Sequence, residues 1–374
     1  MQTAKLIIAD SERSANLYYG TRFLAPDPFI FLQCNGRRML LMSDLEVDRA
    51  RAQAKVDEVR PTSGVADALK RQGKQEPGFL DILDAVLKEQ AISRLEVPGD
   101  FGVSHADGLR AKGYAVEPVS EPFFPGRVVK TGEEIAAITE TLRVTEGALA
   151  CAVDLIANSR IEPDGTLELG GKPLTAELVR TAMHLTMMER GCVAQHTIVA
   201  GGLQAVDPHQ EGAGPLRANE PIVIDVFPQH ARTRYFADLT RTVVKGQASD
   251  KVRRMFDAVR AGQEIAFRMI RDGVDGADVH RAILDSFEAL GFPTGELHGR
   301  MQGFFHGTGH GVGLEIHEPP RIGPRADRLR TGMVVTVEPG LYYTDAGGMR
   351  IEDMVVVTSD GCRVLSQAPK TLEV

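Results

Sequence analysis

The sequence has few cysteines and no long hydrophobic run. Cys34, Cys151, Cys192 and Cys362 are far apart and show no paired metal-binding spacing, which is typical of reduced, mostly buried thiols in a cytoplasmic protein. No stretch approaches the ~20 apolar residues that span a membrane. The apolar run within the N-terminal MQTAKLIIADSER is also too short for the core of a signal peptide.

Positive charge is also limited. Lys and Arg total 43 against 51 Asp and Glu, which gives a net charge of −8. Nucleic-acid binding without sequence preference needs clustered cations, so this class of function is disfavoured. The chain is otherwise ordinary, with 43% hydrophobic and 25% charged residues. Its 374 residues suggest about two domains.

Histidine is scarce too, yet three of the ten histidines lie in one stretch. Phe304–Pro320 reads FFHGTGHGVGLEIHEPP and places His306, His310 and His317 among four alternating glycines. Such glycines allow tight bends and close backbone approach, which suits a metal or polar active site. Two other interpretations remain open from this stretch alone. One is a dinucleotide-binding loop, although its usual strand and helix are missing; the other is a glycine-rich surface loop.

The first part of the chain, residues 1 to about 125, alternates apolar runs with helical patterns. Asn35 and Gly36 separate two apolar runs, which is a hairpin signal. The predicted elements are strands at Phe29–Leu32, Met39–Met42, Leu95–Pro98 and Tyr114–Val119, and helices near Asp44–Gln53 and Phe79–Glu89. This alternation predicts a small sheet covered by helices. This first part of the chain holds no cluster of His, Asp, Glu or Cys with catalytic spacing. We interpret it as a lid, a dimer surface or both.

A change of pattern near residue 126 predicts the start of a second domain. The segment Glu121–Arg127, EPFFPGR, is the best linker candidate because of its prolines and glycine. Thr131 and Glu134 match a capping box at the start of a long helix.

The second domain shows helices followed by strands, twice over. Predicted helices are Leu174–Arg190, with Leu178, Leu185 and Met188 on one side, Asp250–Arg271 and Ala277–Leu290. Predicted strands are Cys192–Ala200, Ile222–Phe227, Tyr235–Val244, Met333–Val337 and Arg350–Val357. The repeated order suggests an internal pseudo-repeat, and the short turns favour an antiparallel sheet.

Four acids interrupt otherwise apolar strand patterns: Asp225, Asp238, Glu338 and Glu352. An unpaired carboxylate costs several kcal/mol to bury. Each acid could pair with an arginine or lie on an exposed face, but four of them favour a shared cation site. Two divalent ions would neutralise the four charges, and the oxygen-rich set leans towards Mn²⁺ over Co²⁺, Fe²⁺ or Zn²⁺. Two such ions can activate water and polarise a carbonyl group, which is typical of metal-assisted hydrolysis.

The ordered set IVID, DLTRTV, HGTGHGVGLEIHEPP, TVEPGLY and MRIED is highly specific. It resembles the pita-bread metallopeptidases, which include prolidases, aminopeptidases P, methionine aminopeptidases and the metal-free creatinases. SDLEVDRA resembles part of the N-terminal domain of the prolidase branch. The resemblance covers nearly the whole chain and implies an α/β N-terminal domain (1–126) and an α+β pita-bread catalytic domain (127–374). The latter is a pseudo-twofold, curved antiparallel sheet covered by helices. A homodimer is implied as well.

The resemblance also implies roles for individual residues. The metal ligands fall on Asp225, Asp238, His310, Glu338 and Glu352: Asp225 chelates one ion, Asp238 and Glu352 bridge both, and His310 and Glu338 complete the second. Glu338 also takes the proton of the attacking water. His317 contacts the substrate carbonyl, His209 lies near the scissile nitrogen, and His306 is another active-site histidine. The other histidines considered, His105, His184, His230, His280 and His298, are interpreted as surface or packing residues.

The implied reaction is hydrolysis of the bond before proline in a di- or oligopeptide. Arg321, in HEPPR, resembles the arginine that holds the product-side carboxylate in prolidases, which favours a Xaa-Pro dipeptidase. Arg350 is predicted to contact the substrate or to brace the acids. The main alternative is an aminopeptidase P acting on longer peptides. A methionine aminopeptidase generally lacks the N-terminal unit, a creatinase has lost the ligands, and a non-enzymatic binding paralogue usually loses them as well.

One departure from the family pattern concerns the hairpin between the first two ligands. The family usually has a small residue and a glycine after the first Asp, whereas this chain reads DVFPQHARTRYFAD. The segment is two residues longer than usual and has no glycine. We therefore expect a reshaped hairpin with both Asp still on one side.

Overall fold

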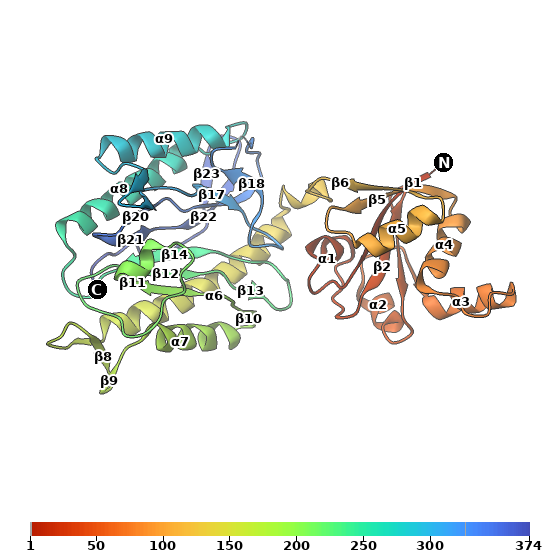
Figure 1. Cartoon of the computed structure of the whole chain (residues 1–374), viewed down its shortest axis with the longest axis horizontal. Helices are drawn as coiled ribbons and strands as arrows, with labels where there is room; N and C mark the ends of the chain where they lie inside the picture. The colour runs from red at the N-terminus through yellow and green to blue at the C-terminus, as the bar shows by residue number, and fades with distance from the viewer. Residues whose placement is uncertain (1, 326) are drawn as a thin grey trace. The chain divides into compact units, whose positions relative to one another are not determined.

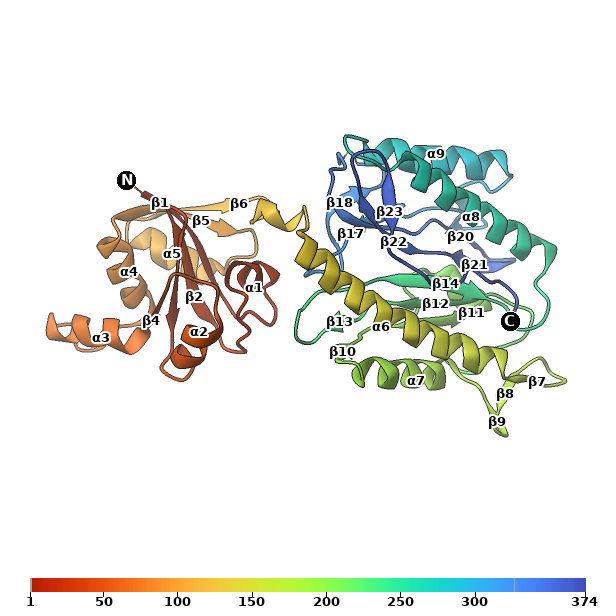
Figure 2. The ribbon, with the colours of Figure 1, turned by 180° about the vertical axis from the view of Figure 1, so that it is seen from behind.

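The computed structural model describes residues 2–325 and 327–374 (Figures 1 and 2). The chain forms two compact units, Met1–Arg127 and Val128–Val374, and each has a hydrophobic core of its own. Every helix within the described residues is too short or too polar to cross a membrane.

The N-terminal unit is built on a six-stranded mixed sheet in the order β4-β3-β2-β1-β5-β6. Its strands are β1 (Gln2–Ala9), β2 (Phe29–Cys34), β3 (Arg37–Met42), β4 (Glu58–Pro61), β5 (Ile92–Pro98) and β6 (Ala115–Val119). Its helices are α1 (Ala15–Thr21), α2 (Val47–Gln53), α3 (Thr62–Arg71), α4 (Phe79–Glu89) and α5 (Val103–Ala111). Leu6 and Ile7 enter different cores because successive strand side chains point to opposite faces. The predicted α/β architecture is confirmed.

The hairpin predicted between β2 and β3 is present. Its turn residues, Asn35 and Gly36, have φ values of 51° and 80°, as a tight type I′ turn requires. The predicted linker Glu121–Arg127 behaves differently. Phe123 and Phe124 are buried in the N-terminal unit, because two phenylalanines carry too much apolar surface to remain in a solvated linker.

The second unit repeats one arrangement twice. In the first half, α6 (Gly132–Ala157) and α7 (Ala176–Met188) cover the antiparallel sheet β11-β12-β14; in the second, α8 (Asp250–Met269) and α9 (Gly276–Ala289) cover the sheet β18-β17-β19-β22-β23 (Figure 1). The strands of the two sheets are β11 (Ile198–Gly201), β12 (Ile222–Val226), β14 (Leu239–Val243), β17 (Gly309–Gly311), β18 (Glu318–Ile322), β19 (Val334–Val337), β22 (Asp353–Val357) and β23 (Cys362–Val364). Their strand pairs are antiparallel, as predicted.

Short elements connect these layers. They are β7 (Arg160–Ile161), β8 (Leu167–Leu169), β9 (Lys172–Pro173), β10 (Cys192–Val193), β13 (Gln229–His230), β15 (Gly295–Leu297), β16 (Arg300–Gln302), β20 (Gly340–Tyr343), β21 (Gly347–Arg350), and the 3₁₀ helices η1 (Pro125–Arg127) and η2 (Gly202–Val206). The capping box that opens α6 is confirmed. Thr131 Oγ1 accepts a hydrogen bond from the amide of Glu134, and Glu134 Oε2 accepts one from the amide of Thr131.

Three of the predicted strands are shorter or interrupted. Cys192–Ala200 is divided into β10 and β11, Tyr235–Val244 begins as a strand only at Leu239, and Arg350–Val357 is broken at Ile351 and Glu352. Apolar content alone predicted continuous strands. The chain instead leaves the regular ladder next to the acids, where the side chains must point into a pocket.

The apolar side predicted on α7 faces outward. Leu178, Leu185 and Met188 are 51%, 58% and 64% exposed. A second apolar stripe, which includes Val179 and Met183, is buried against the sheet instead.

Candidate metal centre

The centre of the glycine–histidine segment is a short buried strand, β17, packed between two other strands, which excludes both a dinucleotide-binding loop and a surface loop. β17 carries His310 between Gly309 and Gly311, and all three residues are buried. A Cβ atom at Gly309 would lie 2.0 Å from the carbonyl oxygen of Thr336, and one at Gly311 would lie 2.4 Å from that of Pro319. The glycines are therefore needed because β18 and β19 pass so close on either side.

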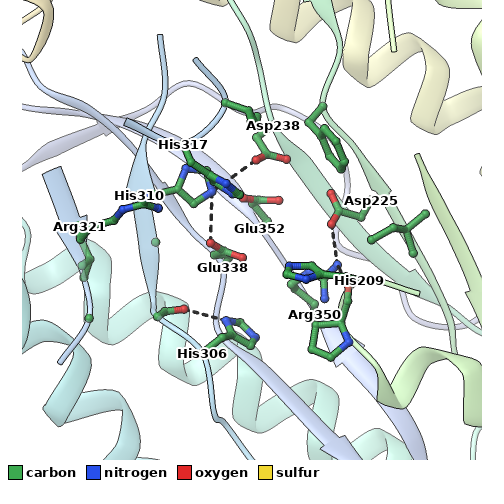
Figure 3. A pocket seen from close by; sticks show the side chains of 18 of the residues that line it. His209, Asp225, Asp238, His306, His310, His317, Arg321, Glu338, Arg350 and Glu352 are labelled. Atoms are coloured by element: carbon green, nitrogen blue, oxygen red, sulfur yellow. Dashed lines mark hydrogen bonds and ion pairs between the residues drawn. The ribbon is translucent and has the colours of Figure 1, made fainter. Parts of the chain in front are cut away.

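The four acids stand at or near strand ends and converge on this histidine. Asp225 is the penultimate residue of β12, and Asp238 immediately precedes β14. Glu338 follows β19, and Glu352 lies in the break between β21 and β22. Figure 3 shows their carboxylates directed into one pocket together with His310.

The distances within this group are short. Ligand atoms of Asp238, His310 and Glu352 all lie within 4.8 Å of one another. His310 Nε2 is 3.5 Å from Asp238 Oδ2 and 3.4 Å from Glu338 Oε1 (Figure 3). The structure thus brings together four of the five predicted ligands, and Asp225 lies in the same pocket.

The electrostatics of the group are unfavourable without a cation. Burial, and then the neighbouring carboxylates, raise the pKa values of Asp238 and Glu352 well above their ordinary range. Burial raises the pKa of Glu338 to about 7, and the charge of Asp225 adds to the shift. Burial lowers the pKa of His310 to about 3. These directions show acids that resist ionisation and a histidine that stays neutral.

Unpaired oxygen atoms indicate that a metal ion fits the site. Asp225 Oδ1, Asp238 Oδ1 and Glu352 Oε1 are buried without a hydrogen-bond partner within the described part of the chain. His310 Nδ1 lies 3.2 Å from the carbonyl oxygen of Gly311 and must donate to it, so the lone pair of Nε2 faces the carboxylates. An acceptor nitrogen among carboxylate oxygens has no proton to share, and a divalent cation satisfies all of them.

A chain of hydrogen bonds leads away from Asp225. Arg350 Nη2 donates to Asp225 Oδ2 at 2.6 Å, and Arg350 Nη1 donates to Tyr342 Oη at 2.7 Å. Tyr342 Oη is 2.9 Å from His306 Nε2, and His306 Nδ1 is 2.8 Å from the carbonyl oxygen of Gly307. The carbonyl fixes the proton on Nδ1, so Tyr342 donates to Nε2. Burial and the charge of Arg350 lower the pKa of His306 to about 3, which keeps this histidine neutral.

The remaining predicted residues line the pocket. The ring of His317 stacks edge-on against that of His310, with centroids 4.3 Å apart. His209 is exposed in the pocket. Arg321 lies on β18 directly opposite His310. The buried Arg350 faces Asp225 instead, which is the brace for the acids considered from the sequence.

Several pocket residues were missed by sequence reasoning. The cavity of about 880 Å³ is also lined by His196, Ile198, Glu211, Phe227 and Phe305. Phe227 belongs to the enlarged hairpin, and its position two residues after Asp225 was the available signal. His196 and Glu211 carried no signal, because they meet only through the fold. Tyr342 is the last residue of TVEPGLY, but nothing in that motif indicated that its hydroxyl group contacts His306 and Arg350.

Comparisons with known proteins identify the family and the fold. Residues 136–359 match the model of metallopeptidase family M24. The chain is 30% identical to the Xaa-Pro dipeptidase of Pyrococcus furiosus over 282 residues, which cover 74% of this chain and 75% of that protein. An X-Pro aminopeptidase structure from Thermotoga maritima has a TM-score of 0.81 at 25% identity, covering 100% of this chain and 98% of that one. A Xaa-Pro dipeptidase structure from Bacillus anthracis gives 0.80 at 25%, covering 100% and 95%.

These matches confirm the fold and the enzyme class that the motifs implied. The family match begins within α6 and ends just beyond β22, so it includes the whole candidate metal centre. The chain therefore belongs to metallopeptidase family M24 and is a peptidase with the pita-bread fold.

Proposed function

We propose that this peptidase is a dinuclear-metal Xaa-Pro dipeptidase. The observation that carries the proposal is the position of Arg321. Its backbone lies opposite the ligand His310, its side chain lines the pocket (Figure 3), and among the described residues nothing hydrogen-bonds to or pairs with its guanidinium group. An arginine held there without a protein partner is suited to a carboxylate of the substrate, which it can bind at two points.

The chemistry of a Xaa-Pro dipeptide matches this position. Proline has no amide N–H and its ring fixes φ, so ordinary extended-strand recognition fails at the bond before it. In a dipeptide, a free carboxylate follows only one residue beyond that bond. Arg321 supplies the charge for it, whereas Arg350 is already paired with Asp225. The name of the Pyrococcus furiosus relative supports the same substrate class.

Replacing Arg321 with alanine tests this assignment. We expect kcat/KM for Xaa-Pro dipeptides to fall by about 10- to 100-fold, because a charged hydrogen-bonded contact contributes roughly 1.5–3 kcal/mol. Xaa-Pro-Xaa peptides should be affected much less. Arg363→Ala, which removes an exposed arginine outside the pocket on β23, is the matched control. If the wild type prefers the longer peptides, or Arg321→Ala leaves dipeptide cleavage intact, an aminopeptidase acting on longer peptides replaces the dipeptidase.

We infer that two divalent ions, with Mn²⁺ preferred, occupy the site when the enzyme is active. Asp225, Asp238, His310, Glu338 and Glu352 would hold them, since carboxylate-rich sets favour hard cations. Bound ions would polarise the substrate carbonyl and increase the acidity of water. The protein's own groups then have three tasks, which are to accept a proton from the attacking water, to orient the carbonyl and to donate a proton to the leaving nitrogen.

Glu338 fits the first task because its carboxylate lines the pocket, with Oε1 3.4 Å from His310 Nε2, where it can accept a proton from water held at the metal centre. His317 fits the second, and His209 lies in the pocket where it can donate to the proline nitrogen. Both histidines lie outside the ligand set. Burial and the charge of Arg321 lower the pKa of His317, so its imidazole acts as a neutral donor.

Alanine at His209 or at His317 should therefore reduce turnover and leave metal binding unchanged. We expect kcat to fall by about 10²-fold, since removing one positioned donor typically costs that much. Metal content per chain, measured beside kcat, separates the two roles. His298→Ala, a histidine outside the pocket, provides the control. Loss of metal in either variant would make that histidine a ligand.

Two further expectations remain predictions. The resemblance implies a homodimer, with the N-terminal unit as a lid or a dimer surface. The free cysteines Cys34, Cys151, Cys192 and Cys362 are the basis for expecting a cytoplasmic enzyme.

A further inference from the structure

One wall of the pocket combines apolar side chains with a carboxylate that the proposed mechanism does not use. Ile198 on β11 is the register partner of Asp225, and Phe227 follows Asp225 by two residues. Side chains two residues apart on an extended segment point to the same face. Ile198 and Phe227 both line the pocket, so they form an apolar surface directly beside Asp225.

Glu211 borders this surface where β11 begins. Its Oε1 is 2.8 Å from His196 Nδ1, and its backbone carbonyl accepts a hydrogen bond from Val199 at 2.9 Å. Glu211 Oε2 has no hydrogen-bond partner within the described part of the chain. The backbone of Glu211 is therefore fixed along β11, and one carboxylate oxygen remains available to a ligand.

Strand register places His196 beside Phe227. Val193 pairs with Gln229, and Ile198 pairs with Asp225, so the residues between these pairs run alongside each other. His196 has a φ of 57°, a left-handed conformation that few non-glycine residues adopt. Such a conformation persists only where the surroundings impose it, and it often marks a functional site.

Distance along the strand decides which part of a substrate reaches Glu211. His196 lies two residues from Ile198, or about 7 Å at the usual rise of an extended strand. The ammonium nitrogen of a dipeptide lies only about 2.5 Å from its scissile carbonyl carbon, and that carbon must remain at the metal centre. A lysine side chain carries its charge several ångströms further on a four-carbon stem.

Arg180 Nη1 donates to the backbone carbonyl groups of Glu211 and Gly212 and does not hydrogen-bond to the Glu211 carboxylate. Asp207 is paired with Arg300 at 3.4 Å. Of the three arginines that line the pocket, Arg350 is paired with Asp225, and Arg321 and Arg325 belong to β18 and the segment after it, on the side of His310. The end of the pocket beyond Asp225 therefore carries an available negative charge above apolar walls.

We propose that Ile198, Phe227 and Glu211 form the subsite for the side chain before proline and select a basic residue, lysine or arginine, there. The proposal rests on the peptidase activity proposed above and names its substrate class. The stem of the basic side chain packs on Ile198 and Phe227, as long cationic side chains do on apolar surfaces. The charged group meets Glu211 at the pocket end.

Two peptides that differ in one charge test the subsite. Lys-Pro and norleucyl-Pro share the same hydrocarbon stem, but only lysine carries the ammonium group. For the wild type we expect kcat/KM for Lys-Pro to exceed that for norleucyl-Pro by about fivefold, the size of a half-exposed ion pair. Glu211→Gln should bring the ratio close to one, and Glu211→Arg should bring it below one. Glu189→Gln, which removes an exposed carboxylate at the end of α7 outside the pocket, should retain the wild-type ratio.

The same ratio measured with Lys-Pro-Ala and norleucyl-Pro-Ala separates this inference from the dipeptidase assignment. If only the longer peptides are cleaved but the ratio depends on Glu211, the dipeptidase fails and the subsite stands. A ratio that is equal in the wild type and in Glu211→Gln overturns the subsite. An equal loss for Lys-Pro, norleucyl-Pro and Gly-Pro in Glu211→Gln also overturns it, because Glu211 would then bind the backbone ammonium. If no proline peptide is cleaved, both proposals fail.

Discussion

Replacing Glu338 with glutamine should lower kcat by at least about 100-fold, because proton transfer by a positioned side chain contributes roughly 10²–10⁴-fold. Glutamine preserves the size of the side chain but cannot take up the proton. The Glu338 side chain is only 19% exposed, with Oε1 3.4 Å from His310 Nε2. Its backbone amide donates to the carbonyl of Thr308 at 2.7 Å, so the substitution should leave the strand end in place. Steady-state kinetics on a Xaa-Pro dipeptide at saturating Mn²⁺ measure the effect.

Metal content and the far-UV circular dichroism spectrum must be recorded for the same variant, because Glu338 is also a predicted ligand. Glu189→Gln again serves as the control for removing one negative charge. A Glu338→Gln enzyme that holds metal and retains near-wild-type kcat would show that another group accepts the proton.

Removing divalent ions with a chelator should abolish hydrolysis and lower the Tm, and the loss of Tm should grow as the pH rises. In the folded protein without metal, burial raises the pKa values of Asp238, Glu352 and Glu338. A group whose pKa is raised on folding stabilises the folded state at acid pH, and this contribution is lost as the pH rises through the folded pKa. For Glu338 that value is about 7. Bound cations remove the penalty of ionisation, so the loaded protein should lack this trend.

Thermal melts of chelated and Mn²⁺-loaded protein, from mildly acidic to mildly alkaline pH, test this prediction. Metal analysis of the loaded form should give about two ions per chain. Asp238→Asn should flatten the pH trend of the chelated protein, whereas Asp285→Asn, at an exposed position on α9, should not. A chelated protein whose Tm rises with pH would contradict the prediction. So would a protein that retains no metal after incubation with Mn²⁺.

Features set by neighbours in the sequence were predictable. The capping box of Thr131 and Glu134 and the turn at Asn35 and Gly36 depend on residues within a few positions of each other. The clustering of acids followed from the cost of burying charge, since four carboxylates in apolar strands favour a shared cation site over four separate ion pairs. That reasoning identified the group around His310.

Features set by packing between distant segments were not predictable. Helix α7 carries two apolar stripes, and periodicity cannot tell that Val179 and Met183 face the sheet while Leu185 faces solvent. The contact of His196 with Glu211 depends on a left-handed residue in the break between two strands. The effect of the enlarged hairpin also became visible only in the fold. Tyr235 Oη donates to Glu134 Oε1 at 2.6 Å, and the amide of Phe236 donates to the carbonyl of Gly313 at 2.8 Å.

The dispersed origin of the acids has a consequence for how the molecule assembles. The amide of Glu352 donates to the carbonyl of Thr240 at 3.0 Å, so ligands far apart in the sequence meet through long-range backbone pairing. Closing such long loops costs conformational entropy before the contacts between their ends can stabilise the chain, so this step of folding is slow. The cation therefore finds no preformed site in the early folding chain and cannot act as its nucleus. We therefore expect metal loading to be a late maturation step, in which the folded chain, with its mutually repelling carboxylates, exchanges protons for ions.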